Sequence, residues 1–296
     1  MGKNFKELVD METGEITVVE STYSPQTHEI RNIRQADYQK KWREQGANQF
    51  TWAFQRDIRT LLSENKINLT SLGAVLVLLP YLDNDGYLKR RTVEGKPMLT
   101  RKDIKEILKV SEVTLKRTLK ALKDTGIIAV EGSRRNQIFK LNTDLHLRGQ
   151  LPDGVIEAVR IQNKGIKALH EETNIKLDTL GFLYLLIPYI SYKSCMLVKN
   201  VNKPEELINS LSMEELCEEL KMADRTVNKY LKLKFKYSFK DGYYEVPAFV
   251  FVTNPSYPKK KATLINPMLV RRNMEITGEI RFSELDCVFK SMSKKL

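Results

Sequence analysis

The chain has few residues with redox or metal chemistry, since only 3 of its 296 residues are cysteine and 3 are histidine. Cys195, Cys217 and Cys287 form no Cys-x-x-Cys pair, so we predict reduced thiols rather than a disulfide or a zinc site. The histidines share no ligand spacing with one another or with the cysteines. We therefore expect neither a metal nor another cofactor.

Long apolar runs are missing as well. The two longest apolar stretches, residues 69–82 and 177–190, are shorter than the ~20 residues that a bilayer-spanning helix needs. We read both as buried helices. Residues 1–7 contain no apolar stretch of signal-peptide length. These absences predict a cytoplasmic protein without a membrane partner.

The chain also lacks recognisable catalytic signatures. It has no phosphate-binding Gly-x-x-x-x-Gly-Lys-Ser/Thr motif, and Gly95-Lys96 is followed by Pro97. Strand nicking would need a catalytic tyrosine beside a metal-binding histidine pair, and the sequence contains no such pair. We predict that the protein is not an enzyme.

Positive charge is what the chain has in excess, with a formal net charge of +12. Residues 87–148 contain 16 Lys or Arg against 7 Asp or Glu, which leaves +9, whereas residues 193–261 contain 13 against 9, which leaves +4. Such an excess suits a polyanionic partner. Its concentration in residues 87–148 points to that region as the place where the partner binds.

The sequence repeats itself. Residues 69–81 match residues 177–189 at an offset of 108, and both stretches end in Pro-Tyr. The match resumes at an offset of 112 in the next helices, and at 124 between residues 142–154 and 266–278. Because the offsets grow only where loops fall, we predict a duplicated domain.

Residues 99–130 predict a helix-turn-helix. Thr100 and Asp103 have the spacing of a capping box, Ser111 is the natural start of a second helix, and Gly126 is its natural end. Two apolar segments, near residues 127–130 and 138–141, predict a hairpin with a basic turn. A helix-turn-helix followed by such a hairpin is the pattern of a winged helix.

The predicted fold is therefore mainly α with small β-hairpins (α+β), built from tandem duplicated winged helix-turn-helix domains. We expect Trp52, Phe54, Ile58 and further apolar residues to form the packing face of a leading helix over residues 35–64. The predicted parts are an extended N-terminal segment, a first domain with its leading helix, a helical connector, and a second domain with a C-terminal tail: residues 1–34, 35–149, 150–176 and 177–296.

The second helix of a winged helix enters the major groove of DNA, and its hairpin reaches phosphates or the minor groove. We expect Arg117 to contact guanine and Thr114 to reach a base edge or a phosphate. The alternative is that these residues form only a solvated helix face. The predicted DNA-binding residues of this copy are Thr100, Ser111, Thr114, Lys116, Arg117, Lys120, Lys123, Arg134 and Arg135.

The second copy keeps the apolar pattern and changes the surface. Ser212 and Asp224 are its expected helix caps, and residues 253–261 are expected to form a long loop. Four glutamates in the preceding helix disfavour DNA, so dimerisation or partner binding remains an alternative for this copy. Its predicted DNA-binding residues are Arg225, Thr226, Asn228, Lys229, Lys232, Lys259 and Lys260.

Several segments resemble the RepL-type replication proteins of Firmicute plasmids, which contain a MarR-like winged helix. The similar segments are residues 9–16, the aromatic residues 49–54, Thr114, Leu119 and residues 126–128, and finally Leu141, Asn142, Leu145, Arg148 and Gly149. The resemblance covers roughly residues 9–149, and the second winged helix departs from it. It implies a cytoplasmic protein of a plasmid or phage that binds double-stranded DNA at an origin.

We thus expect a sequence-specific, double-stranded DNA-binding protein that controls transcription or replication at an operator, promoter or origin. The alternatives are an initiator that recruits host replication proteins, and a winged-helix module that binds proteins. The expected partners are DNA, with host replication or transcription proteins and a homodimer left open. The two copies in one chain would act as a pseudo-dimer on two half-sites.

Overall fold

A computed structural model describes residues 4–9, 16–21, 50–90, 95, 97–133, 136–151, 157–191, 194–202, 210–239, 242–254, 257–271 and 289–296. The chain forms two compact units, Met1–Ala47 and Asn48–Leu296. In the first unit, strands β1 (Asn4–Val9) and β2 (Ile16–Ser21) pair antiparallel. This hairpin lies in the N-terminal segment that we expected to be extended.

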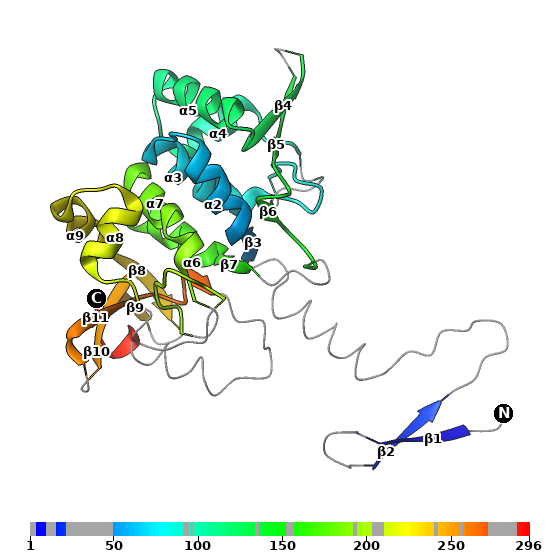
Figure 1. Ribbon diagram of the computed structural model, residues 1–296. Coiled ribbons are helices and arrows are strands. Elements are labelled where there is room, and N and C mark those ends of the chain that lie inside the picture. Colours follow the sequence, from blue (N-terminus) through cyan, green and yellow to red (C-terminus); the bar gives the residue numbers. More distant parts are fainter. Residues whose placement is uncertain are drawn as a thin grey trace. The chain divides into compact units, whose positions relative to one another are not determined.

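The second unit has a mixed α and β fold with small antiparallel sheets, as the α+β prediction required. In its first half, residues 50–147, the described residues form nine elements in chain order (Figure 1). They are β3 (Phe50–Phe54), α2 (Gln55–Glu64), α3 (Leu69–Leu78), the 3-10 turn η1 (Leu79–Tyr81), α4 (Arg101–Leu108), α5 (Glu112–Asp124), β4 (Ile128–Gly132), β5 (Gln137–Leu141) and β6 (His146–Leu147).

The second half, residues 158–271, begins with the same kinds of element. They are β7 (Ala158–Gln162), α6 (Asn163–Lys167), the π-helical turn η2 (Ala168–Glu172), α7 (Leu177–Leu185), the 3-10 turn η3 (Ile187–Tyr189), α8 (Met213–Leu220), α9 (Asp224–Leu231), β8 (Lys234–Phe239), β9 (Gly242–Pro247), β10 (Phe249–Asn254), β11 (Tyr257–Ile265) and β12 (Val270–Arg271). A final strand, β13 (Lys294–Lys295), pairs with β9.

Side-chain caps explain where most of the paired helices begin. Thr100 and Asp103 form the predicted capping box at α4, and the Ser111 hydroxyl accepts the Thr114 N–H at α5. Ser212 likewise caps α8, in a box with Glu215. Each such cap satisfies a backbone donor that the first helical turn leaves free. These three caps, predicted from the sequence, are confirmed.

The predicted cap at α9 is wrong. Ala223 occupies the cap position and has no side-chain oxygen, so α9 starts without a side-chain cap. Asp224 is instead the first helical residue, and its carboxylate accepts hydrogen bonds from the Asn228 side chain at 2.9 and 3.0 Å. A carboxylate in the first turn still favours the helix, because it lies at the positive end of the helix dipole.

A four-stranded antiparallel sheet joins the two halves, with strand order β12-β7-β3-β6. β3 and β7 form its centre, where Trp52 pairs with Arg160. Two short strands form the edges, β6 beside β3 and β12 beside β7. The sheet therefore contains one central and one edge strand from each half.

Helices α3 and α7 pack against each other through glycines. A Cβ atom on Gly73 would lie 1.8 Å from the backbone oxygen of Leu177, and one on Gly181 would lie 1.9 Å from that of Leu69. No side chain fits at either position, because these distances are far below any van der Waals contact. Figure 1 shows the two helices side by side, between the α4–α5 pair and the α8–α9 pair.

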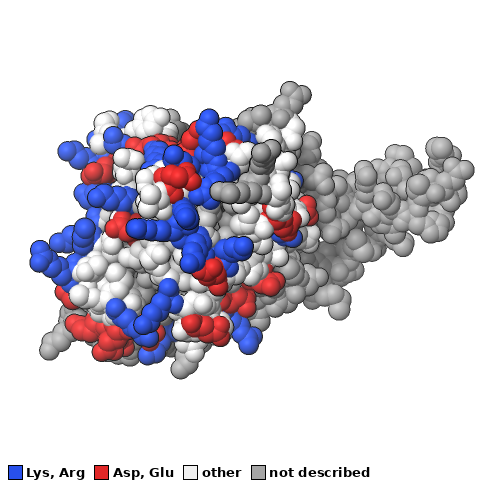
Figure 2. Space-filling model, turned by 90° about the horizontal axis from the view of Figure 1, so that it is seen from above, with Lys and Arg blue, Asp and Glu red and all other residues white. Residues whose placement is uncertain are grey.

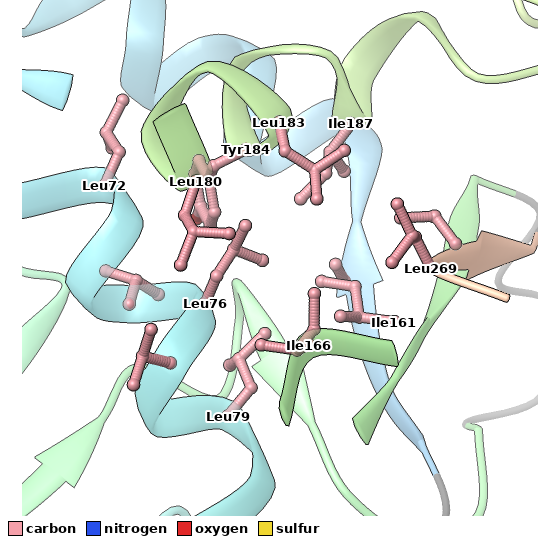
Figure 3. Close-up of a cluster of buried hydrophobic side chains, with 14 of the residues drawn as sticks. Leu72, Leu76, Leu79, Ile161, Ile166, Leu180, Leu183, Tyr184, Ile187 and Leu269 are labelled. Carbon is pink, nitrogen blue, oxygen red and sulfur yellow. The ribbon is translucent and has the colours of Figure 1, made fainter. Parts of the chain in front are cut away.

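A hydrophobic core runs through both halves. Figure 3 shows Leu72 and Leu76 of α3 in a cluster that includes Leu180 and Leu183 of α7. Ile161 of β7 belongs to the same cluster and is fully buried. Because one core serves both halves, their packing contributes jointly to the stability of the unit.

The leading helix is shorter than predicted. Residues 50–54 form the buried strand β3 rather than helix, and α2 begins only at Gln55. The first part of the predicted helix, residues 35–49, lies outside the described residues. β3 forms because aromatic residues fit a strand, and because β6 and β7 satisfy its backbone on both sides.

Two further segments differ from prediction. The connector, residues 150–176, contains the expected helical turns in α6 and η2, and also strand β7. The expected long loop, residues 253–261, is largely strand, because β10 and β11 pair with a register shift near Thr253 and Asn254. Pro258 lies within β11 between Tyr257 and Lys261, the two residues whose partners flank this register shift. Such an irregular position tolerates a residue without a backbone N–H.

Candidate nucleic-acid interface

Helices α4 and α5 follow each other in the chain with a short turn between them. Lys109, at the end of α4, takes a left-handed backbone conformation with φ of 52°, and α5 starts three residues later. Ile104 and Leu108 of α4 are buried, as are Leu115 and Leu122 of α5. Burial of these faces leaves the opposite face of α5 towards solvent.

The exposed face of α5 is strongly cationic. Lys116, Arg117, Lys120 and Lys123 are all exposed. Within the described part of the chain, no Asp or Glu forms an ion pair with any of these four residues. Val113 lies near the start of the same helix and is 60% exposed. This face therefore combines uncompensated positive charge with an accessible apolar group.

The acidic residue at the start of α5 is neutralised. Glu112 accepts hydrogen bonds from the Arg101 guanidinium at 2.7 and 3.0 Å, and its second oxygen lies 3.8 Å from Lys105 Nζ. The hydrogen bond from Arg101 lowers the pKa of Glu112 below its usual range. These contacts link α5 to α4 and offset the negative charge nearest to the cationic face.

The predicted polar ligands Thr100, Ser111 and Thr114 all serve as helix caps or cap partners. The Ser111 and Thr114 hydroxyl oxygens lie 3.0 Å apart, and Thr100 belongs to the α4 capping box. Thr114 is half-buried, whereas Ser111 and Thr100 are exposed. A hydroxyl can also donate its hydrogen to an outside acceptor, so capping leaves a role in ligand contact available.

The predicted β4–β5 hairpin forms after Gly126. Its strands pair from Ile128 opposite Leu141 to Gly132 opposite Gln137. Gly132 has a φ of +84°, and a Cβ there would lie 2.3 Å from the backbone oxygen of Asn136. The two backbones thus lie close together at this end of the hairpin. Arg134 and Arg135, the predicted phosphate contacts in this turn, lie outside the described residues.

The second helix pair presents a weaker cationic surface. Arg225, Lys229 and Lys232 are exposed, with Lys232 at the end of α9, whereas Thr226 and Asn228 are half-buried. α9 has only eight residues, compared with thirteen in α5. The second helix pair therefore has exposed cations on a shorter helix.

Acidic side chains lie on the helix before α9. Glu219 of α8 is paired with Lys199 at 2.9 Å, and the hydrogen bond from Lys199 lowers the pKa of Glu219. Glu214 and Glu218 are exposed. Lys259 and Lys260 belong to β11, and their side chains lie outside the described residues. α8 is thus more acidic than α4, its counterpart in the first half.

One residue of the cationic face is missing from the sequence-based set. Val113 is exposed on this face but is not among the DNA-binding residues predicted from the sequence. Its 60% exposure is the signal for such a role, because a β-branched apolar side chain on a helix surface can contact a thymine methyl group.

Figure 2 shows the side on which α4 and α5 lie in Figure 1, with Lys and Arg spread over it and Asp and Glu between them.

Within the described ranges, no group of three or more His, Cys, Asp or Glu side chains is placed to hold a metal ion. No helix there has both the length and the apolar character needed to span a membrane. Comparison with protein-family models, curated proteins and solved structures gave no match for this chain.

Proposed function

We propose that the protein binds double-stranded DNA in a sequence-specific manner and has no catalytic activity of its own. In this proposal α4, α5 and the β4–β5 hairpin form one winged helix, and α8, α9 and the following strands form a second. α5 is the main recognition helix. Control of transcription or replication would follow from where the bound site lies.

The cationic face of α5 carries the proposal. An α-helix fits the major groove of B-DNA, provided that one side of the helix is free to enter it. α5 meets this requirement because its apolar side is buried against the core and its exposed side has four uncompensated cations. Phosphates on both edges of the groove would supply the missing negative charge.

The residues of this face are proposed to contact either DNA bases or phosphates. Arg117 lies near the middle of α5, where its planar guanidinium can contact guanine O6 and N7 together. Lys116, Lys120 and Lys123 would contact phosphates, which need charge rather than a fixed shape. Val113 would contact a thymine methyl. The β4–β5 turn with its two arginines would reach the neighbouring backbone.

The second copy is proposed to contact DNA less strongly than the first. Arg225 and Lys229 provide exposed cations on α9, in support of DNA contact. Glu214 and Glu218 on the preceding helix oppose it, because exposed carboxylates repel phosphates. We assign α5 the larger share of affinity for this reason.

A pair of matched double variants tests the proposal. Arg117→Ala/Lys120→Ala removes two charges from α5, and Arg56→Ala/Lys66→Ala removes two exposed charges from α2 and the segment after it. We expect the first pair to weaken binding of a random-sequence duplex, measured by fluorescence anisotropy in moderate salt, by at least tenfold. The second pair should change it little. Equal effects of both pairs would contradict the proposed interface.

The site of action needs a separate experiment. Recovery of the DNA bound by the protein in its host cells, followed by sequencing, distinguishes operators and promoters from an origin. An initiator predicts recovery of origin DNA, and a plasmid with that origin should then fail to replicate without the protein. A transcription regulator predicts recovery of promoter DNA instead.

A further inference from the structure

The two halves of the second unit are related by a twofold rotation at the sheet. Trp52 and Arg160 are 108 positions apart, and they pair with each other at the centre of β3 and β7. On either side, Phe50 pairs with Gln162 and Phe54 with Ala158. At the offset of 108, the Phe50–Gln162 pair becomes the Ala158–Phe54 pair, so each pair is converted into another pair of the same ladder. A twofold axis through the Trp52–Arg160 pair produces this pattern.

The edge strands obey the same rotation. His146 of β6 pairs with Ala53, and Val270 of β12 pairs with Ile161. Ala53 and Ile161 are again 108 positions apart, while the edge residues differ by 124, the offset seen in the sequence for this region. The symmetry therefore extends across all four strands.

The glycine contacts provide a second, independent observation of the axis. Gly73 of α3 contacts the Leu177 backbone, and Gly181 of α7 contacts the Leu69 backbone. Leu69 and Leu177, like Gly73 and Gly181, are 108 positions apart. The contact is therefore isologous, with the same two surfaces meeting in reverse order. One axis relates the helices and the sheet.

A tandem duplication alone does not fix this geometry, because two copies in one chain can follow each other by translation or by rotation. α5 packs against α3, and α9 packs against α7 through the stacked rings of Tyr230 and Phe182, whose centroids are 4.8 Å apart. The recognition helices are thus attached to the two elements that the axis relates. Rotation presents them to DNA in opposite orientations.

The two recognition helices have different chemistry at equivalent positions. At the offset of 112, Val113 of α5 corresponds to Arg225 of α9, and Arg117 corresponds to Lys229. Lys116 corresponds to Asn228. Valine favours a thymine methyl, whereas arginine favours guanine, so the two helices favour different bases.

The buried core is also unequal on the two sides of the axis. The Tyr184 hydroxyl and His146 Nε2 lie 3.0 Å apart and both residues are buried. The positions equivalent to Tyr184 and His146 are Leu76 and Val270, which are apolar. This polar pair has no polar equivalent across the axis, so the twofold relation between the two halves is approximate.

From this geometry, and resting on the proposed DNA binding, we infer that the target is an imperfect inverted repeat. Its two half-sites run in opposite directions and have different sequences, and α5 and α9 of a single chain occupy them. One chain therefore occupies both half-sites, whereas a palindromic site is bound by two identical subunits.

Selection from a pool of random duplex DNA with the intact chain tests the inference. We expect an enriched motif with two unlike halves in inverted orientation, bound by one chain per duplex in native mass spectrometry. Enrichment of two halves in the same orientation, of a single half-site, or of a duplex that binds two chains would overturn the inference while leaving DNA binding intact. No enrichment of any duplex would overturn both.

Two graft variants make the test directional. The triple variant Val113→Arg/Lys116→Asn/Arg117→Lys places the proposed DNA-contacting residues of α9 on α5. The triple variant Arg225→Val/Asn228→Lys/Lys229→Arg places those of α5 on α9. Each variant should select a true palindrome, made of the α9 half-motif in the first case and the α5 half-motif in the second. We expect each to bind its palindrome about tenfold more tightly than the wild-type motif. Selection of the unchanged wild-type motif by either folded variant would contradict the inference.

Discussion

Trp52 and Arg160 lie opposite each other at the centre of the four-stranded sheet, and the Arg160 guanidinium is 4.8 Å from the centroid of the Trp52 ring. Arg160 also lies 5.0 Å from the Phe50 ring. Arginine over aromatic faces at this distance forms a favourable cation–π contact. This contact joins the two halves at the point where their symmetry axis crosses the sheet.

The glycines between α3 and α7 give the first prediction. In a helix interior, glycine-to-alanine substitution ordinarily stabilises by ~1 kcal/mol. We expect Gly73→Ala and Gly181→Ala to have the opposite sign and to lower the free energy of unfolding by about 1–3 kcal/mol, because the new methyl group would meet backbone oxygen. Urea unfolding measures this effect, with Thr70→Ala on the same helix as the control. Stabilisation by either glycine variant would contradict the close approach of the helices.

The buried histidine gives a prediction about pH. Burial lowers the pKa of His146 to about 3, whereas the unfolded chain has an ordinary histidine pKa of ~6.5. Above pH 6.5 both states are neutral at this residue, so it adds no pH dependence. Below that pH the unfolded state binds a proton that the folded state cannot, and stability falls by up to ~1.4 kcal/mol per pH unit.

A variant isolates this contribution from other titrating groups. His146→Leu/Tyr184→Phe removes both members of the buried hydrogen bond together, which avoids leaving one of them without its partner. The free energy of unfolding, measured from pH 7 to pH 4, should fall less steeply in the variant than in the wild-type protein. Identical slopes would show that His146 accepts a proton in the folded state.

Substitution of Arg117 and substitution of Lys120 should impair DNA binding in different ways. We expect Arg117→Ala to reduce discrimination between the selected duplex and a mutated one by about 1–3 kcal/mol. Lys120→Ala should weaken binding to both duplexes equally and lower the slope of log K against log salt concentration by about 1. Competition binding at several salt concentrations separates the two. Equal, non-selective losses from both variants would remove the base-reading role of Arg117.

Glu112 should restrain DNA binding. Its carboxylate holds Arg101 by a hydrogen bond at 2.7 Å and lies close to Lys105 at 3.8 Å. We expect Glu112→Gln to raise the affinity for duplex DNA, because it removes a negative charge next to the cationic face and releases two cations. Glu64→Gln, at the exposed end of α2, is the matched control. If both variants bind DNA like the wild-type protein, Glu112 lies away from the interface.

Local signals explain what could be predicted from the sequence. The starts of α4, α5 and α8 follow from cap residues a few positions away from their backbone partners. The end of α5 follows from Gly126, whose φ of +70° favours glycine. The cationic face of α5 follows from helical periodicity within one segment. All of these depend on neighbours in the chain.

The missed elements depend on distant neighbours instead. β3 was mistaken for helix because its five buried residues do not alternate with polar ones, and its partner β7 lies over 100 residues away. Pro258 and the lysines after it resemble a loop, although they lie within β11, which pairs with β10 at Tyr257 and from Lys261 onwards. The relative orientation of the two halves could not be predicted either, because the repeated sequence pattern gives the offset between matching residues and not the rotation that relates the halves.

Site-specific cross-linking tests the central proposal most directly. A photoreactive phenylalanine analogue at position 113, which is 60% exposed near the start of α5, should cross-link to a base of bound duplex DNA. The same analogue at position 56 on α2 should give no such product. A base adduct from position 113 alone is the predicted result. Cross-linking from position 56 instead, or from neither position on a duplex that remains bound, would contradict the placement of α5 in the groove.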